Sequence, residues 1–296
     1  MKPVISTAFL IILILLKMDV QAQSFKTIET NSLTLQVYNA SEKSFGVSSV
    51  IVSGKTDAVL IDAQFTLADA ENVAQQIKKS GKKLTAIYVS YGDPDFYFGL
   101  EVFKKYFPEV TAYAAPATVE HIKATAQKKL DVWGAQLGKN ITSNVILPQV
   151  LKGNSIDLEG QKIEIVGLEE FPTKTFVWIP SIKAAVGGIN VFGTTFNLWM
   201  ADAQTPEARQ QWINVLDKIE ALQPAIVVPA HAKSESAFDL SAVKHTKTYI
   251  QFYEEVLKTN KTSDAIIAAI KAKYPALAFD IALQLGAKVN SGEMKW

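Results

Sequence analysis

Side chains able to bind a transition metal are scarce in this sequence. It contains no cysteine, and its three histidines are His121, His231 and His245. Two carboxylates, Asp93 and Asp95, stand two residues apart. Zinc favours imidazole together with a carboxylate, whereas carboxylates without imidazole favour hard cations such as Ca²⁺ or Mg²⁺. If any metal binds, we expect its ligands to come from Asp93, Asp95 and His231.

The histidines also have interpretations that involve no metal. His121 and His245 each fall within a predicted helix, without clustered donors, so both are expected to be ordinary helix residues. Asp95 and His231 could form a buried hydrogen-bonded pair, in which the carboxylate would raise the pKa of the imidazole. Such a pair could serve acid–base chemistry or simply be held by packing. A serine triad through Ser90 is disfavoured, because the chain has no Gly-x-Ser-x-Gly motif.

Strand and helix signals define the elements that must position these residues. Short β-rich segments at 35–38, 47–52 and 58–61 predict a strand meander. Thr66 and Asp69 resemble a capping box at the start of a helix that ends before Gly81. Strands at 84–89 and 110–113 then alternate with helices at 98–106 and from Pro116 onward.

The second part of the chain repeats this order. A hairpin turning at Glu159 and Gly160 and strands at 175–179 and 183–186 come first. A helix from Thr205 and Pro206 follows, and its predicted buried stripe is Trp212, Val215, Leu216, Ile219 and Leu222. A strand at 225–228 and helices at 239–257 and 263–273 are expected to complete the chain. Two successive β-then-α halves indicate an α/β fold, an αββα sandwich of two facing mixed sheets with helices outside.

The first residues resemble an export signal. Lys2 precedes an unbroken apolar run of nine residues, 8–16, and Val20-Gln21-Ala22 is a small-x-small cleavage pattern. The run is too short to span a bilayer core of about 30 Å. We expect cleavage after Ala22, a mature domain of residues 23–296, and a periplasmic or secreted location.

Charge and composition exclude several classes of protein. Removing the charged residues of the expected signal leaves equal numbers of basic and acidic side chains, so no nucleic-acid partner is implied. Without cysteine the chain has neither disulfides nor thiolate metal sites. No later segment is apolar enough to span a membrane, so no membrane association is expected after signal cleavage. The oligomeric state stays open.

Three segments together resemble the metallo-β-lactamase-fold superfamily. They are Ala58-Val59-Leu60-Ile61-Asp62, Ser90-Tyr91-Gly92-Asp93-Pro94-Asp95-Phe96-Tyr97-Phe98-Gly99 and Val227-Val228-Pro229-Ala230-His231. They match the strand-end aspartate, the T-H-x-H-x-D-H-x-x-G metal loop and the terminal G-H of that superfamily in order and spacing. The resemblance implies the αββα fold and hydrolysis by a hydroxide bound to one or two zinc ions.

The same resemblance shows where zinc donors are missing. In the metal loop, Tyr91, Asp93 and Phe96 stand where the family has histidine, and only Asp95 keeps the family residue. The family's bridging aspartate aligns with Ile189, and no histidine lies near 169–174. Phenyl and aliphatic side chains have no donor electrons for zinc. We therefore expect no zinc and no other cofactor.

The remaining site residues each have two interpretations. Asp62 either orients a metal ligand or bonds loop amides at a strand end. The residues expected to line the family's substrate cleft are Tyr91, Asp93, Phe96, Tyr97, Ile189, Asn197 and Trp199. Their aromatic rings beside a carboxylate suit an apolar or cationic small molecule, or they fill the volume left by metal and histidines. Trp133, Trp178 and Trp199 are expected mainly to pack.

These residues support three hypotheses about function. The leading one is a zinc-free pseudoenzyme that binds a small molecule or a partner, or keeps the site only as structure. The second is an active hydrolase for an ester, lactone, β-lactam or phosphoester, using a hard cation at Asp93, Asp95 and His231 or metal-free acid–base groups. Asp95, His231 and Asp62 would be its catalytic candidates. In the third, the C-terminal helices present a partner surface.

Overall fold

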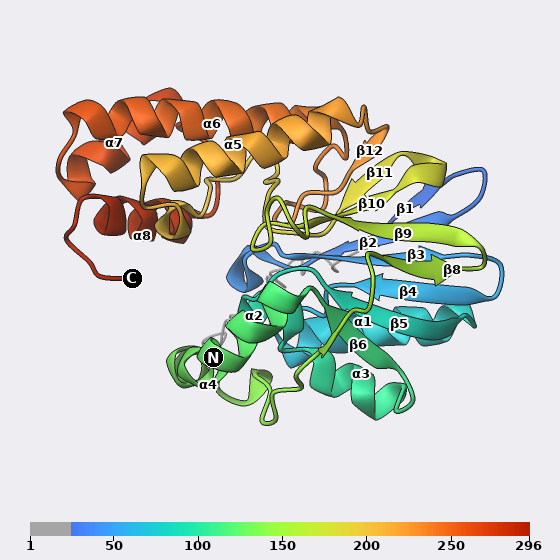
Figure 1. The fold of residues 1–296 in the computed structure, drawn as a ribbon. Helices are drawn as coiled ribbons and strands as arrows, with labels where there is room; N and C mark the ends of the chain where they lie inside the picture. The colour runs from blue at the N-terminus through green and yellow to red at the C-terminus, as the bar shows by residue number, and fades with distance from the viewer. Residues whose placement is uncertain (1–24) are drawn as a thin grey trace, which may run out of the picture.

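Two β-sheets form the centre of the computed structural model, which describes residues 25–296 (Figure 1). The first sheet has seven strands in chain order: β1 (Phe25–Glu29), β2 (Thr34–Asn39), β3 (Ser48–Ser53), β4 (Asp57–Ile61), β5 (Lys83–Val89), β6 (Thr111–Ala114) and β7 (Gln149–Val150). Neighbours from β1 to β4 are antiparallel, and those from β4 to β7 are parallel. Parallel neighbours need long crossovers, which here contain helices.

The second sheet has the order β12-β11-β10-β9-β8. Its strands are β8 (Ser155–Leu158), β9 (Gln161–Val166), β10 (Phe176–Ile179), β11 (Ala184–Val186) and β12 (Ile226–Val227). Only β11 and β12 pair in parallel; the other pairs are antiparallel. β8 and β9 form the hairpin predicted at Glu159 and Gly160.

Alternating side chains build two hydrophobic cores. In β4, Val59 and Ile61 point into the core between the sheets, whereas Ala58 and Leu60 point to the helices. The same alternation recurs in β2, β3, β5 and β10. Each sheet is therefore covered on both faces, as an αββα sandwich requires.

Helices cover the outer faces of both sheets (Figure 1). The helices are α1 (Leu67–Ser80), α2 (Pro94–Tyr97), α3 (Leu100–Tyr106), α4 (Pro116–Leu137), α5 (Pro206–Ala221), α6 (Leu240–Thr259), α7 (Ser263–Lys273) and α8 (Asp280–Asn290), with short 3₁₀ turns η1 (Glu42–Ser44), η2 (Gly138–Asn140), η3 (Pro180–Ile182) and η4 (Met200–Asp202). α1 packs with α3, and α5 packs with α6. Helices α6 to α8 extend beyond the sandwich (Figure 1).

The predicted fold class is confirmed, and three element predictions need correction. The helix expected over 98–106 begins later, as α3, and a separate short helix, α2, precedes the expected range; between them the N–H of Gly99 donates to the carbonyl oxygen of Gln64, after β4. α8 was not expected at all, nor was β1. The helix starts at Thr66 and Thr205 do carry their caps, since each hydroxyl accepts the N–H three residues on.

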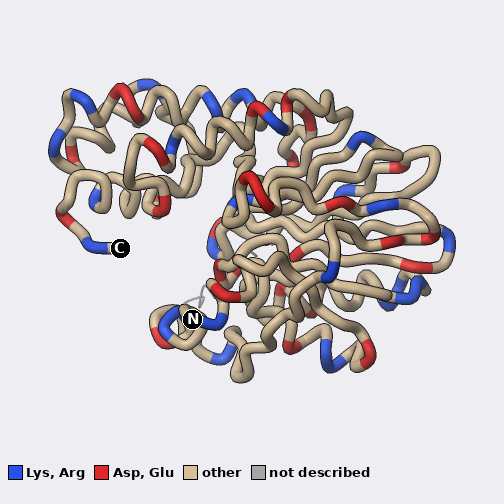
Figure 2. Tube along the Cα trace, in the orientation of Figure 1, with Lys and Arg blue, Asp and Glu red and all other residues tan. Residues whose placement is uncertain are grey.

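Basic and acidic residues are scattered over the whole trace, with both signs interspersed (Figure 2). Within residues 25–296, none of the helices is long and apolar enough to cross a membrane. The expected signal segment 1–22 and its cleavage site lie outside the described residues, so they remain predictions.

A single carboxylate ties the two sheets together at the end of the sandwich. Glu159, in the β8–β9 turn, accepts the backbone N–H groups of Lys55, Thr56 and Asp57 in the β3–β4 turn at 2.7 to 2.8 Å. These bonds lower the pKa of Glu159 to about 2. A glutamine here has only one acceptor oxygen and no charge.

We expect Glu159→Gln to lower the melting temperature at neutral pH. Because the folded-state pKa is depressed, the stabilisation by Glu159 is complete above pH 4.5 and is lost as the pH falls toward 2. The difference in melting temperature between wild type and variant should therefore shrink between pH 4.5 and 2. Exposed Glu109, changed to glutamine, is the control. A difference that stays constant over this range would contradict the assignment.

Candidate functional site

The loop that follows β5 contains half of the candidate residues and is fixed against the residues that follow β4. The N–H of Ala63 donates to the carbonyl oxygen of Phe96 at 2.8 Å, and the N–H of Gly99 donates to that of Gln64 at 2.9 Å. A Cβ at Gly99 would lie 1.9 Å from the carbonyl oxygen of Ala63. Only glycine permits this approach, so the position of the loop is specified by the sequence.

Asp62 anchors the start of this loop. It is 2% exposed, and its two carboxylate oxygens accept the N–H and the hydroxyl of Ser90, each at 2.7 Å. The hydroxyl oxygen of Ser90 in turn accepts the N–H of Gly188 at 2.6 Å. Burial raises the pKa of the Asp62 carboxyl to about 7, against the effect of the two bonds from Ser90. Asp62 thus joins β4, β5 and the loop after β11, and Ser90 has no free hydroxyl for nucleophilic attack.

Asp95 and His231 are brought together, as their alignment with family ligands implied. The Nε2 atom of His231 lies 3.5 Å from a carboxylate oxygen of Asp95, and both side chains are buried. The Nδ1 atom lies 3.0 Å from the carbonyl oxygen of Phe45, which can only accept, so Nδ1 carries the proton. The imidazole therefore directs its free lone pair at Asp95.

The expected rise in the pKa of His231 is wrong. Burial lowers that pKa to about 4, and burial also raises the pKa of Asp95 well above its ordinary value. At neutral pH the imidazole is therefore uncharged, and the carboxyl of Asp95 is harder to ionise than an ordinary aspartate. Desolvation outweighs the attraction between the two groups, and the charge of Asp93 adds to the rise in the pKa of Asp95.

Aromatic rings enclose the imidazole of His231. Phe192 stacks on it with ring centroids 5.0 Å apart, Phe279 stacks at 5.6 Å, and Phe96 meets it edge-on at 5.9 Å. Tyr91 packs edge-on against Phe96 at 5.5 Å. The space around His231 is thus filled by carbon rather than by metal donors.

Asp93 is engaged by a lysine of the neighbouring helix. Its carboxylate forms an ion pair with Lys129 of α4. The ammonium group of Lys129 also lies 2.9 Å from Nε2 of His121 and 3.1 Å from the carbonyl oxygen of Gly92. Because an ammonium group can only donate, the Nε2 atom of His121 is an acceptor, and His121 is neutral. His121 was expected to be an ordinary helix residue. It does lie in α4, and it also contacts Lys129, which pairs with Asp93.

The other expected cleft residues have separate surroundings. Tyr97 is fully buried and packs edge-on against Phe98, with ring centroids 5.1 Å apart. Ile189 is part of the core between sheet and helices. The side-chain amide of Asn197 donates to the carbonyl oxygen of Ala278 at 2.9 Å, which directs it to the α7–α8 connection. Trp199 is half-buried and stacks on Phe279 at 5.8 Å.

The residues present do not fit a zinc ion. Of the family's ligand positions, only Asp95 and His231 place a donor beside each other, and these two contact one another directly. Among residues 25–296, no group of three or more His, Cys, Asp and Glu side chains is arranged to hold a metal. A structural zinc site takes four protein ligands and a catalytic site takes three. The donor set is therefore too small.

Several residues that shape the site gave no signal in the sequence. Lys129 comes from α4, Phe279 from the start of α8, and Phe45 from the turn after η1. Asp202 and Lys174 add charge nearby: burial and the charge of Asp93 raise the pKa of Asp202 to about 6, and burial lowers the pKa of Lys174. None of these five contacts has a fixed spacing in the chain that could have revealed it.

The fold and the site together define a class of protein. Two facing mixed sheets, helices outside, and a β4-end aspartate beside a loop that meets His231 describe an αββα sandwich. Three solved structures have a similar fold. A metallo-β-lactamase from Pontibacter korlensis is 17% identical, with 77% of this chain and 99% of that chain covered and a TM-score of 0.52. Metallo-β-lactamase IND-7 is 18% identical, with 78% and 100% covered and a TM-score of 0.55.

The third, VMB-1, is 17% identical, with 78% of this chain and 98% of that chain covered and a TM-score of 0.51. No family model and no curated protein matches the sequence. At these identities the likeness concerns the fold. The chain has the metallo-β-lactamase fold.

Proposed function

We propose that this chain is an exported, zinc-free protein that uses a hydrolase scaffold to bind a small molecule or a partner rather than to hydrolyse one. The observation that carries the proposal is the surroundings of His231. Phe192 and Phe279 stack on its ring, Phe96 meets it edge-on, and its one free nitrogen faces the buried carboxyl of Asp95. A metal-bound hydroxide needs several donors and room for water, and these surroundings supply neither.

A hydrolase working without zinc is the alternative, and the contact between Asp95 and His231 is the observation in its favour. A general base must reach its substrate within hydrogen-bond distance. Asp95 is 6% and His231 is 3% exposed, and aromatic rings enclose the imidazole. Asp93, the remaining donor for a hard cation, is paired with Lys129. The geometry therefore favours the non-catalytic proposal.

Export is supported by the N-terminal sequence, and partner binding by exposed apolar side chains. Ile281, Met294 and Trp296 are 39%, 38% and 53% exposed and all lie in or after α8. Exposed apolar residues that gather in one region are a mark of interaction surfaces. A small-molecule ligand has the additional support of a pocket beside the same helices, described below.

The test is a measurement of metal and turnover on the mature chain. The protein is purified without chelator, its metal content is measured by mass spectrometry, and ester, lactone, β-lactam and phosphoester substrates are assayed. We expect much less than one zinc per chain and no turnover above background. A metallo-β-lactamase prepared in parallel controls for loss of metal. Stoichiometric zinc, or robust turnover that is abolished by His231→Ala, would overturn the proposal.

A further inference from the structure

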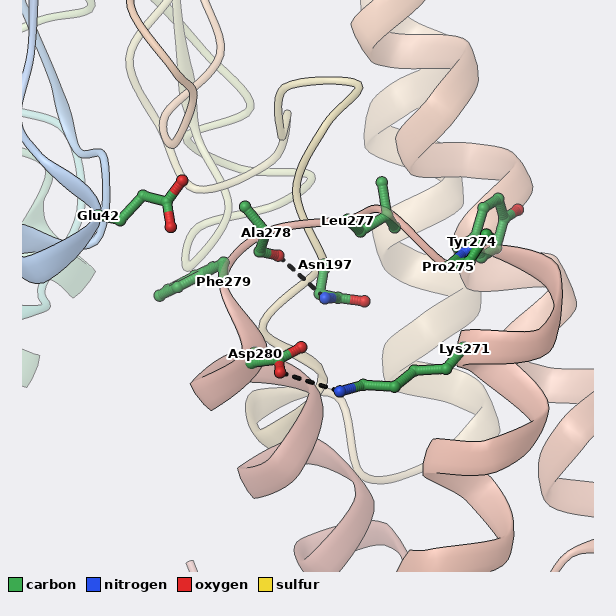
Figure 3. A pocket seen from close by; sticks show the side chains of 9 residues that line it. All are labelled: Glu42, Asn197, Lys271, Tyr274, Pro275, Leu277, Ala278, Phe279 and Asp280. Atoms are coloured by element: carbon green, nitrogen blue, oxygen red, sulfur yellow. Dashed lines mark hydrogen bonds and ion pairs between the residues drawn. The ribbon is translucent and has the colours of Figure 1, made fainter.

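A pocket of about 350 Å³ lies between η1 and the α7–α8 connection (Figure 3). One wall carries Glu42 of η1, and the other is formed by the end of α7, the α7–α8 connection and the start of α8. Phe279 lines this pocket and also stacks on His231, so its ring separates the two sites. Ligand pockets are common where two packed parts of a chain meet, and this volume is at the small end of their range.

The walls of the pocket are fixed before any ligand binds. The N–H of Ala278 donates to the carbonyl oxygen of Thr195 at 2.8 Å, and the N–H of Asn197 donates to that of Ala278 at 3.0 Å. Tyr274 stacks on Tyr249 with ring centroids 5.4 Å apart. A ligand would therefore bind without the cost of ordering this connection.

Charges of both signs are available to a ligand in the pocket. Lys271 and Asp280 lie 2.9 Å apart on one side, and Glu42 lies on the opposite wall (Figure 3). Glu42 forms an ion pair with Lys233 at 3.2 Å, and its side chain is 54% exposed. The side chains of Lys271 and Asp280 are 45% and 57% exposed. An exposed ion pair contributes only about 0–1 kcal/mol, so a ligand can replace it at little cost.

We propose that this pocket binds a small zwitterion with an apolar side chain, an α-amino acid of the size of leucine. Lys271 binds the ligand's carboxylate, Asp280 and Glu42 bind its ammonium group, and Leu277 and Phe279 contact its side chain. The proposal rests on the proposed function in that it names the ligand of a binding protein.

Calorimetric titration with three matched probes tests the proposal. L-Leucine carries both charges, L-leucinamide lacks the carboxylate, and N-acetyl-L-leucine lacks the ammonium group. We expect L-leucine to bind and each derivative to bind at least tenfold more weakly, because L-leucinamide leaves Lys271 without its partner and N-acetyl-L-leucine leaves Asp280 and Glu42 without theirs. Absence of L-leucine binding at millimolar concentration, or equal binding of a derivative, would overturn the proposal.

Variants locate the binding site. Lys271→Met and Asp280→Asn, both at exposed positions, should each weaken L-leucine binding at least tenfold. Lys258→Met, which breaks an exposed ion pair with Glu255 outside the pocket, should leave the affinity unchanged. Binding that survives both pocket substitutions would place the ligand elsewhere and refute the assignment. Zinc content and turnover are measured separately, so failure of this proposal and failure of the proposed function are distinguishable.

Discussion

Replacing four side chains is expected to turn this protein into one that binds zinc. The variant carries Tyr91→His, Asp93→His, Phe96→His and Ile189→Asp. These changes place imidazole and carboxylate donors around Asp95 and His231 on a scaffold with the metallo-β-lactamase fold. Zinc at about one hundred times its dissociation constant stabilises a folded protein by about 2.7 kcal/mol. We expect a clear rise in melting temperature on adding zinc to the variant and none for the wild type.

The control for this experiment separates polarity from metal binding. It carries Tyr91→Gln, Asp93→Gln, Phe96→Gln and Ile189→Asn, which are polar but supply no imidazole and no bridging carboxylate. Phe96 and Ile189 are buried, so polar substitutions there can prevent folding. A double variant, Tyr91→His with Asp93→His, changes only half-buried positions and is therefore tested as well. If both histidine variants fold and neither is stabilised by zinc, the loop does not present its side chains as a metal loop.

Periodicity and turn chemistry were sufficient to predict most of the fold. The stripe of α5 was expected to be buried. Trp212, Val215, Leu216 and Ile219 are buried, whereas Leu222, the C-cap residue of the helix, is only half-buried. Signals of this kind are local, because a helix face repeats every three or four residues and a glycine is needed wherever the backbone turns left-handed. Gly81, which ends α1 with φ of 69°, is an example.

α8 was missed because its start has no local signal. Its N-cap is Phe279, in the left-handed region with φ of 66°, and no side chain caps the first turn. Aromatic residues are rare in this conformation. Packing holds it there, since Phe279 contacts Phe45, Phe196 and Trp199 as well as His231. Such tertiary contacts do not follow any sequence period.

The candidate site, like the fold, could be predicted from the sequence only in part. The spacing of 90–99 located the loop, and the structure places Asp95 beside His231 at 3.5 Å. The state of that pair depends on what surrounds it. Three phenyl rings remove water from the imidazole, so its pKa falls instead of rising. Lys129, which draws Asp93 toward α4, likewise lies far along the chain from the loop it contacts.

Removing the carboxylate of Asp62 should cause a large loss of stability. In Asp62→Ala the buried N–H and hydroxyl of Ser90 both lose their acceptor. A buried donor without a partner costs about 1–3 kcal/mol, so we expect the free energy of unfolding to fall by about 2–4 kcal/mol. Asp62→Asn keeps one acceptor oxygen and should cost less. Chemical denaturation of both variants measures the loss, with exposed Asp131→Asn as the control.

The pH dependence of these variants reports the ionisation of Asp62. Its pKa is raised to about 7 in the folded protein, from about 3.9 in the unfolded chain, so the folded state holds a proton that the unfolded state releases in this window. The stability contributed by Asp62 is therefore complete below pH 4 and decreases as the pH rises to about 7, by up to about 4 kcal/mol. Asparagine does not titrate, so the advantage of wild type over Asp62→Asn should shrink from pH 4 to pH 7. If that advantage grows instead, the carboxylate is ionised in the folded protein, and the bonds from Ser90 outweigh the effect of burial.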